Sequence, residues 1–128
     1  NQPEIRLGSL HPTRDLTYVA DTCEGFVKAA ESDAAVGETI QLGTGRDVSV
    51  GYLVETVQKI LGKNLPVVTK DERIRPEASE IDRLLSSPEK AKRLLGWEPL
   101  HTLEQGLEAH VDWMRQHLDR YRTDAYLV

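Results

Sequence analysis

Apolar side chains recur at helical spacing along several stretches of the chain, and the clearest of them is residues 50–61. One face of this stretch carries six apolar residues: Val50, Leu53, Val54, Val57, Ile60 and Leu61. Ser49 stands just before it, where a side-chain oxygen can accept a hydrogen bond from the first helical turn. Gly62 follows it and suits the left-handed residue that ends many helices. The pattern therefore predicts a helix that is capped by Ser49 and ends at Leu61.

Asp21 marks the predicted start of an earlier helix. Its carboxylate can accept hydrogen bonds from the exposed amides of a first turn, and Glu24 stands three residues later. We expect the apolar stripe of this helix to face the core, and its members are Cys23, Phe26, Val27 and Ala30. Cys23 is therefore expected to be a small buried side chain. Because it is the only cysteine in the sequence, an internal disulfide is excluded.

Two further helices are predicted in the last third of the chain. Ser87 can cap a short helix with Pro88 at its first position, where the missing N–H costs nothing, and Gly96 can end it. Thr102 and Gln105 have the spacing of a capping box, which predicts the start of the last helix. Its apolar positions are Leu103, Leu107, Val111, Met114 and Leu118. Beyond it, residues 119–128 are expected to form a tail.

Short stretches typical of β-strands lie between the helices. We predict strands in residues 5–9, 16–19, 39–42 and 65–69, and we expect the polar segment 70–79 to be irregular. Alternating helices and strands predict an α/β or α+β domain with a short, few-stranded sheet and about four helices. So few short strands cannot form the large parallel sheet of a complete dinucleotide-binding protein.

Composition narrows the class of protein. A length of 128 residues fits a single small domain, residues 1–128, with one hydrophobic core. The net charge of −5, with both signs interspersed, argues against nucleic-acid binding by general electrostatics. No apolar run approaches the roughly 20 residues needed to span a bilayer. We see no secretory signal and expect a cytoplasmic location, and the missing initiator Met indicates a piece of a longer protein or a processed product.

The turn Gly43-Thr44-Gly45 stands between a predicted strand and a predicted helix, as a dinucleotide-binding turn would. The full fingerprint needs a third small residue three positions after the second glycine, where this chain has Val48. We therefore interpret the turn as a plain connection and predict no cofactor site in this chain. His110 and His117 share one helical face without a third ligand nearby, so we predict no metal site either.

Arg14 is the first candidate for binding an anionic ligand. It follows the turn-forming pair Pro12-Thr13, and a guanidinium fixed there can bind a phosphate through two parallel hydrogen bonds. The alternative is a surface ion pair with Asp15 or Asp21, which would contribute little. The spacing of the residues leaves both interpretations open.

Arg73, Arg75 and Glu77 form a second candidate group, clustered around Pro76 in the irregular segment. Arginines around a proline in a loop are common in anion sites, because a rigid backbone loses less entropy when a ligand binds. From these residues alone, however, a solvated, charged loop without a ligand is the preferred interpretation.

Three motifs, in chain order, carry a family resemblance. They are RDLTYVAD (residues 14–21), RIRPEASE (residues 73–80) and SPEKAKRLLGWEP (residues 87–99). Together they resemble the carboxy-terminal part of NAD-dependent sugar-nucleotide epimerases and dehydratases, which are extended short-chain dehydrogenases. The similarity looks closest to 4,6-dehydratases that act on nucleotide-linked N-acetylhexosamines. It covers the chain from about Ile5 to Met114.

The resemblance implies roles for the candidate residues. Arg14 and Arg75 would contact the diphosphate of a nucleotide-diphosphate sugar, and Glu77 would accept a hydrogen bond from its ribose. Arg73 and Ser79 are weaker candidates for the same ligand. Segment 87–99 is implied to be structural, with Trp97 packing back on the helix just ended.

The resemblance also implies what such an enzyme carries in its first half. There a Rossmann domain binds NAD and supplies a Tyr-x-x-x-Lys pair, which is absent here, since the residues four after Tyr18, Tyr52 and Tyr121 are Thr22, Thr56 and Ala125. We therefore expect no catalytic residue in this chain. Its expected role is the substrate-binding portion of a 4,6-dehydratase whose full-length form can be a homodimer. A 4-epimerase, a decarboxylase or a non-catalytic nucleotide-binding module are the alternatives.

Overall fold

The computed structural model describes residues 4–70 and 81–121, and these contain four α-helices. The helices are α1 (Val19–Ala30), α2 (Val50–Leu61), α3 (Glu89–Leu95) and α4 (Leu103–Gln116). Two 3₁₀ turns, η1 (Asp33–Ala35) and η4 (Leu118–Arg120), follow α1 and α4. With the short strands described next, this confirms the predicted class of a small α/β domain with about four helices.

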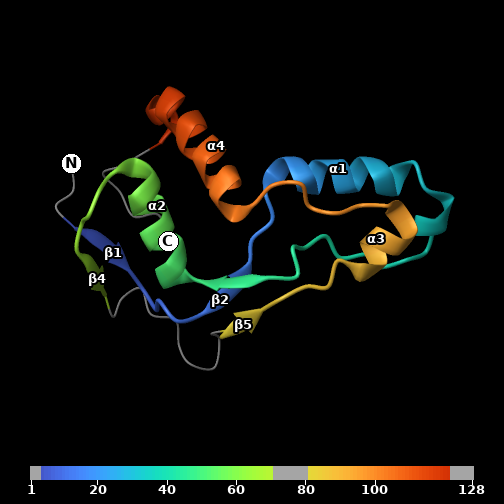
Figure 1. Cartoon of the computed structure of the whole chain (residues 1–128), viewed down its shortest axis with the longest axis horizontal. Coiled ribbons are helices and arrows are strands. Elements are labelled where there is room, and N and C mark those ends of the chain that lie inside the picture. Colours follow the sequence, from blue (N-terminus) through green and yellow to red (C-terminus); the bar gives the residue numbers. More distant parts are fainter. Residues whose placement is uncertain (1–3, 71–80, 122–128) are drawn as a thin grey trace.

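Five short strands in the described ranges form two sheets where one was predicted. β1 (Ile5–Leu7) pairs in parallel with β4 (Val67–Thr69). β2 (Thr13–Asp15) lies between β3 (Asp47–Ser49), which is antiparallel to it, and β5 (Arg83–Leu84), which is parallel to it. Figure 1 shows an elongated molecule with β1, β4 and α2 at one end and α1 and α3 at the other. The β3-β2-β5 sheet lies between these ends.

The predicted capping residues of α2 and α4 act as expected, whereas the N-cap of α3 is Pro88 rather than Ser87, and its side chain makes no capping hydrogen bond. The Ser49 hydroxyl accepts a hydrogen bond from the Tyr52 N–H at 3.1 Å, and Gly62 ends α2 with a φ of 62°. The capping box of α4 is complete, because Thr102 and Gln105 each bind the other's backbone N–H. Gly96 ends α3 in the left-handed conformation, although α3 begins at Glu89, one residue later than predicted.

Helix α1 begins earlier than predicted, and the expected strand at residues 16–19 does not form. The strand lies just before it, in β2, where hydrogen bonds to β3 and β5 on both sides hold the backbone extended. Asp21 lies inside the first turn of α1 rather than ahead of it, since Tyr18 is the capping position. Its carboxylate binds His101 instead of capping the helix.

The apolar face of α1 points to solvent, which contradicts the expected inward orientation. Phe26 is 68% exposed, and Cys23 is exposed rather than buried as predicted. The helix packs through Gly25, where an added Cβ would lie 2.4 Å from Leu42 Cδ1. Because only a glycine permits this close approach, the opposite side of the helix is turned outward. The exposed residues of this outer face are Val19, Cys23, Phe26 and Val27.

Residues 39–42, predicted as a strand, pair with no strand in the described part of the chain. The segment keeps the alternation on which the prediction rested, with Ile40 and Leu42 half-buried and Gln41 exposed. A strand is stabilised by hydrogen bonds to a neighbouring strand. Here the Leu42 side chain instead packs on Gly25 of α1, and its carbonyl lies 3.5 Å from the Thr17 hydroxyl. The strand prediction is therefore wrong for this structure.

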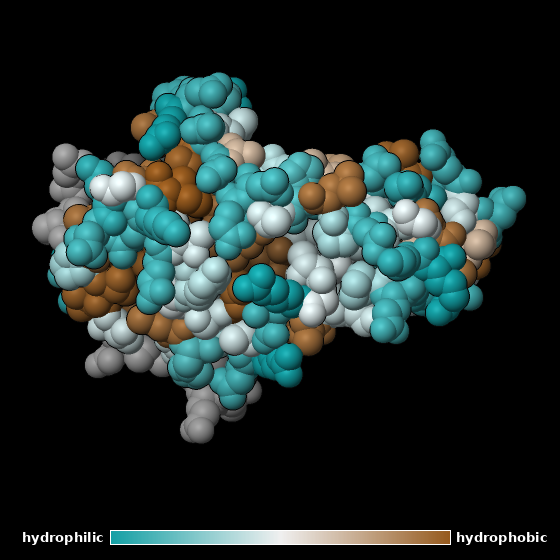
Figure 2. Space-filling view, in the orientation of Figure 1, coloured by the Kyte–Doolittle hydropathy of each residue, from teal (hydrophilic) through white to brown (hydrophobic). Residues whose placement is uncertain are grey.

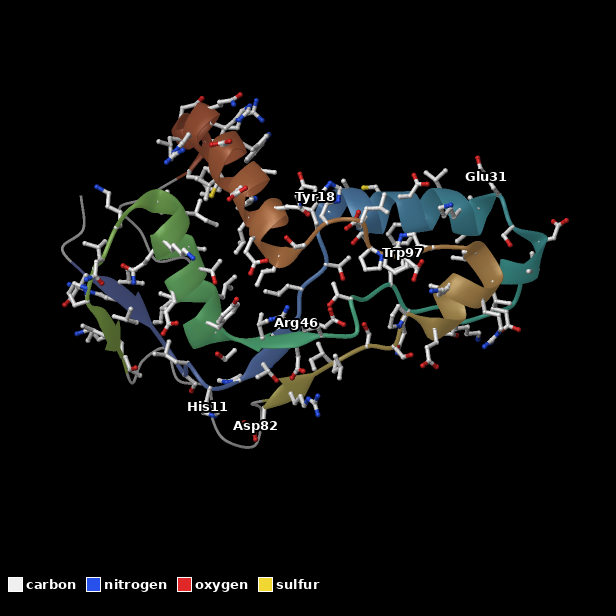
Figure 3. The ribbon with its side chains drawn as sticks, viewed as in Figure 1. His11, Tyr18, Glu31, Arg46, Asp82 and Trp97 are labelled. Carbon is white, nitrogen blue, oxygen red and sulfur yellow. The ribbon has the colours of Figure 1, made fainter. Side chains whose placement is uncertain are left out.

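The core is small and centred on Trp97. Among the described residues the buried apolar side chains are Ala91, Trp97 and Val111. Trp97 is 1% exposed, and its indole Nε1 donates a hydrogen bond to the Asp21 carbonyl at 2.8 Å. Figure 3 places it between α1 and α3. The indole thus joins the segment after α3 to the start of α1, which agrees with the structural role implied for this segment.

Candidate functional site

Arg14 lies in the middle strand of the β3-β2-β5 sheet. It stands opposite Val48 of β3 and Leu84 of β5 in the register of the strands. Its Nη1 donates hydrogen bonds to two backbone carbonyls, that of Thr13 at 2.8 Å and that of Ile81 at 2.6 Å. The side chain is half-buried, and these bonds fix the guanidinium beside the residues that lead into β5. A cation held in this way is suited to an anionic ligand.

The two carboxylates that the sequence suggested as partners of Arg14, Asp15 and Asp21, each bind other groups. Asp15 binds Thr44, Gly45 and Ser86, and Asp21 binds His101. The surface ion pair suggested by their spacing is therefore not the role that either acid has in the structure.

The carboxylate of Asp15 occupies the turn Gly43-Thr44-Gly45. It accepts hydrogen bonds from the Thr44 N–H at 2.9 Å, the Thr44 hydroxyl at 2.6 Å and the Gly45 N–H at 3.0 Å. The Ser86 hydroxyl donates to it from the other side at 3.0 Å. Burial opposes ionisation of Asp15, but these hydrogen bonds together outweigh it and lower the pKa of the carboxyl. One carboxylate thus ties together β2, the turn and the residues that follow β5.

This arrangement does not fit a dinucleotide at the turn. The N–H groups of Thr44 and Gly45, which would meet a phosphate in a dinucleotide-binding turn, bind Asp15 instead. Gly43 is buried, and an added Cβ would lie 1.5 Å from the Ser86 hydroxyl oxygen. The turn is therefore a structural junction that Asp15 holds together.

An ion pair crosses the same sheet from β5 to β3. Arg83 donates from Nε to Asp47 at 2.9 Å and from Nη2 at 3.1 Å, and the Thr13 hydroxyl donates to the same carboxylate. The hydrogen bond from Arg83, followed by that from Thr13, lowers the pKa of Asp47 to about 2. A bidentate ion pair thus joins the two outer strands, β3 and β5, across β2.

The lowered pKa of Asp47 predicts a loss of stability in acid. An aspartate in an unfolded chain titrates near pH 4, so the ionised form is favoured more strongly in the folded state. This contribution is complete above about pH 4 and is lost as pH falls toward 2. Urea unfolding at a series of pH values should show a smaller decline from pH 4 to 2 in Asp47→Asn than in the wild type. Arg83→Gln removes the partner and should give the same change, and a wild-type profile in both variants would contradict the assignment.

Two cavities lie beside the linker between β2 and α1. The larger, of about 310 Å³, is mainly apolar, and its lining includes Leu16, Tyr18, Leu53, Leu107 and His110. The smaller, of about 220 Å³, shares Leu16 with it and adds Arg46 and His101. Figure 2 shows hydrophobic surface below α4, between hydrophilic groups. The linker that follows Arg14 therefore forms a wall of both cavities.

The second candidate group, Arg73, Arg75 and Glu77, lies outside the described residues, as does Ser79. The described chain continues at Ile81, whose carbonyl binds Arg14.

His110 and His117, the two histidines predicted on one face of the last helix, lie in different surroundings. Within residues 4–70 and 81–121, no three His, Cys, Asp or Glu side chains gather as metal ligands would. His110 lines the larger cavity, and His117 stacks on Trp113 at a centroid distance of 4.3 Å. None of the described helices is long and apolar enough to cross a membrane.

Sequence reasoning missed two parts of this region. It treated Asp15 only as a possible ion-pair partner, and it assigned nothing to Ser86 or His101. One signal for Asp15 was available, because a turn rich in glycine and threonine presents several donors to any nearby anion. Nothing in the sequence indicates that Ser86, 71 residues later in the chain, would reach the same carboxylate.

Comparison with known proteins gives consistent matches over most of the chain. The family model described as GDP-mannose 4,6 dehydratase matches residues 1–110. The UDP-glucose 4-epimerase of Bacillus subtilis is 32% identical over 124 residues, which covers 91% of this chain and 35% of the epimerase.

Two solved structures show the same arrangement of elements. One is the UDP-glucose 4-epimerase of Thermotoga maritima with UDP-glucose, with a TM-score of 0.78 and 31% identity over 90% of this chain and 36% of that one. The other is the dTDP-glucose 4,6-dehydratase of Bacillus anthracis in complex with NAD, with a TM-score of 0.77 and 26% identity over 92% of this chain and 36% of that one. The chain therefore spans about a third of the length of these proteins.

Proposed function

Because the chain belongs to the family of the GDP-mannose 4,6 dehydratase model, we propose that it binds the diphosphate of a nucleotide-diphosphate sugar. Arg14 carries this proposal. The residue is half-buried, and its guanidinium donates hydrogen bonds to the backbone carbonyls of Thr13 and Ile81. A fixed guanidinium loses little side-chain entropy when it binds a phosphate.

Further contacts to a nucleotide sugar are proposed in the surroundings of Arg14. The mainly apolar cavity behind the linker offers space for an uncharged part of the ligand, with hydroxyl groups from Thr17 and Tyr18 at its wall. Arg75 and Glu77 are proposed as further contacts to the diphosphate and the ribose, with Arg73 as a weaker contact. A similar protein supports this ligand class, because its solved structure, that of a UDP-glucose 4-epimerase, contains UDP-glucose.

The proposed reaction of the full-length enzyme is 4,6-dehydration of the sugar, with NAD bound by residues outside this chain. The family model and the dTDP-glucose 4,6-dehydratase support it. In such a reaction this chain would only position the substrate. It would hold the diphosphate so that the sugar reaches the NAD and the catalytic residues outside this chain. Residues 1–128 are accordingly proposed to act as one substrate-binding domain.

A 4-epimerase is the second candidate, and the 32% identity to the UDP-glucose 4-epimerase of Bacillus subtilis favours it. Product analysis of the full-length enzyme separates the two reactions. A 4-keto-6-deoxy sugar identifies a dehydratase, whereas a sugar of unchanged mass with inverted C4 identifies an epimerase.

Binding is tested by NMR titration of the labelled chain with UDP, GDP and dTDP. We expect saturable shifts at the amides of residues 13–15 and 81–84 with one of the nucleotides. Arg14→Ala should weaken this affinity about tenfold or more, because a hydrogen-bonded charge is lost, and Arg14→Lys should restore only part of it. Arg115→Ala is the matched control, since Arg115 pairs with Asp112 on the exposed side of α4. Equal affinities in Arg14→Ala and the wild type would contradict the proposal.

The isolated chain is expected to leave nucleotide sugars unchanged, because positioning without a base or a hydride acceptor breaks no bond. The measurement is mass spectrometry of UDP-, GDP- and dTDP-linked sugars after incubation with the pure chain and NAD. Formation of a 4-keto sugar by the chain alone would contradict this expectation.

A further inference from the structure

Asp15 and Arg14 are neighbours on β2, and each reaches a different part of the chain. Asp15 binds the turn at residues 43–45 and Ser86, whereas Arg14 binds the carbonyl of Ile81. Ile81 and Ser86 stand on either side of β5, the two-residue strand Arg83–Leu84. The side chains of Arg14 and Asp15 therefore bind the segment that contains β5, Arg14 before the strand and Asp15 after it.

So short a strand needs anchors outside its own ladder. β5 pairs with β2 only at Thr13–Arg83 and Arg14–Leu84, and the Thr13 N–H donates to the Asp82 carbonyl at 2.8 Å. After β5, the segment is held by Asp15, which accepts from the Ser86 hydroxyl at 3.0 Å and lies 3.4 Å from its N–H. The Arg83–Asp47 pair also holds β5, so the loss of the Ser86 anchor would loosen β5 at one end and disturb the Ile81 carbonyl at the other.

The junction around Asp15 has little room for such a shift while the carboxylate is present. Gly43 lies so close to Ser86 and Asp15 that an added Cβ would be 1.5 Å from the hydroxyl oxygen and 2.8 Å from Oδ2. Charge matters as well as shape, because every group that faces the carboxylate from Thr44, Gly45 and Ser86 is a donor. An asparagine would turn an NH₂ group toward some of these donors and would lose the charge that strengthens the bonds.

We propose that Asp15 is a positioning residue for ligand binding, which holds β5 through Ser86 and so places the Ile81 carbonyl that orients the Arg14 guanidinium. The inference rests on the proposed function only for the identity of the ligand, since the coupling of Asp15 to Arg14 is a property of the free chain. Asp15 touches no ligand in this proposal and acts through Arg14.

The first test measures the free protein. In the wild type the Nε–H signal of Arg14, assigned by its loss in Arg14→Lys, should be that of a fixed guanidinium. Asp15→Asn and the milder Ser86→Ala should both move this signal and the Ile81 amide toward the values of a freely rotating side chain. Asp21→Asn is the control for a general loss of stability, because it removes a carboxylate that binds His101 instead of the sheet. Wild-type signals of Arg14 and Ile81 in folded Ser86→Ala and Asp15→Asn would overturn the proposal.

The second test is a double-mutant cycle on the affinity for UDP, or for GDP or dTDP if one of these binds more tightly. Asp15→Asn should weaken binding about threefold or more when Arg14 is present and should have no further effect in Arg14→Ala. Equal effects of Asp15→Asn in both backgrounds would show a merely structural role and would overturn the inference. An Arg14→Ala variant with wild-type affinity would overturn the proposed function instead, so the two failures are distinguishable.

Discussion

Replacing Trp97 with alanine is expected to lower the free energy of unfolding by about 3–5 kcal/mol, the usual range for a large buried aromatic side chain. Trp97 is 1% exposed, and the described part of the chain contains few other buried apolar side chains, so its neighbours cannot readily fill the space. The loss also leaves the Asp21 carbonyl without the indole donor at 2.8 Å. Urea denaturation followed by circular dichroism measures the change.

Trp97→Phe separates the two contributions. Phenylalanine keeps part of the apolar volume and lacks the N–H, so we expect a loss smaller than that of Trp97→Ala. Trp113→Ala is the control, because Trp113 is 43% exposed on α4 and should cost about 1 kcal/mol or less. A similar loss in Trp97→Ala and Trp113→Ala would show that the core is not centred on Trp97.

Asp21→Ala is expected to lower the free energy of unfolding by about 1–3 kcal/mol, because it leaves two part-buried donors of His101 without their buried acceptor. Asp21 is 3% exposed, and its carboxylate accepts hydrogen bonds from the His101 N–H at 3.1 Å and lies 2.8 Å from His101 Nδ1. Burial opposes ionisation, but the interactions with His101, together with the backbone of Leu100, outweigh it and lower the pKa of Asp21. The contribution of the carboxylate is therefore complete above the pKa of an unfolded aspartate, near pH 4, and is lost as pH falls below it.

The measurement is the midpoint of urea unfolding at pH 7 and at pH 3 for the wild type and Asp21→Ala. The difference between the two proteins should be large at pH 7 and smaller at pH 3. His101→Ala keeps the backbone donor and should lose only part of the stability. A difference that is the same at both pH values would contradict a role for the ionised carboxylate.

Local signals in the sequence predicted helices better than strands in this chain. Ser49, Gly62, Thr102 and Gly96 fix helix ends through groups within a few residues, so the sequence contains both partners of each bond. A strand depends on a partner distant in the chain. Residues 39–42 have the alternation of a strand, but they pack on α1, and β2 forms at residues 13–15 because β3 and β5 lie on both sides of it.

Burial was also decided by distant contacts. The apolar pattern of α1 predicts an inward stripe, yet Gly25 fits against Leu42 so closely that the glycine side faces inward and Phe26 faces out. Contacts between distant residues also determine the geometry of the candidate site. Arg14 was predicted from its motif, whereas its contact to Ile81, 67 residues away, could be found only in the folded chain.

The outer face of α1 gives the protein a convenient chemical handle. Cys23 is the only cysteine in the sequence, and it lies exposed on this face beside other apolar side chains. A maleimide dye would therefore attach at one known position, on a different element from the β3-β2-β5 sheet. Its fluorescence would report contact with the apolar face. The same thiol would allow two copies to join through a disulfide in oxidising buffer, so a reductant belongs in each preparation until it is removed for labelling.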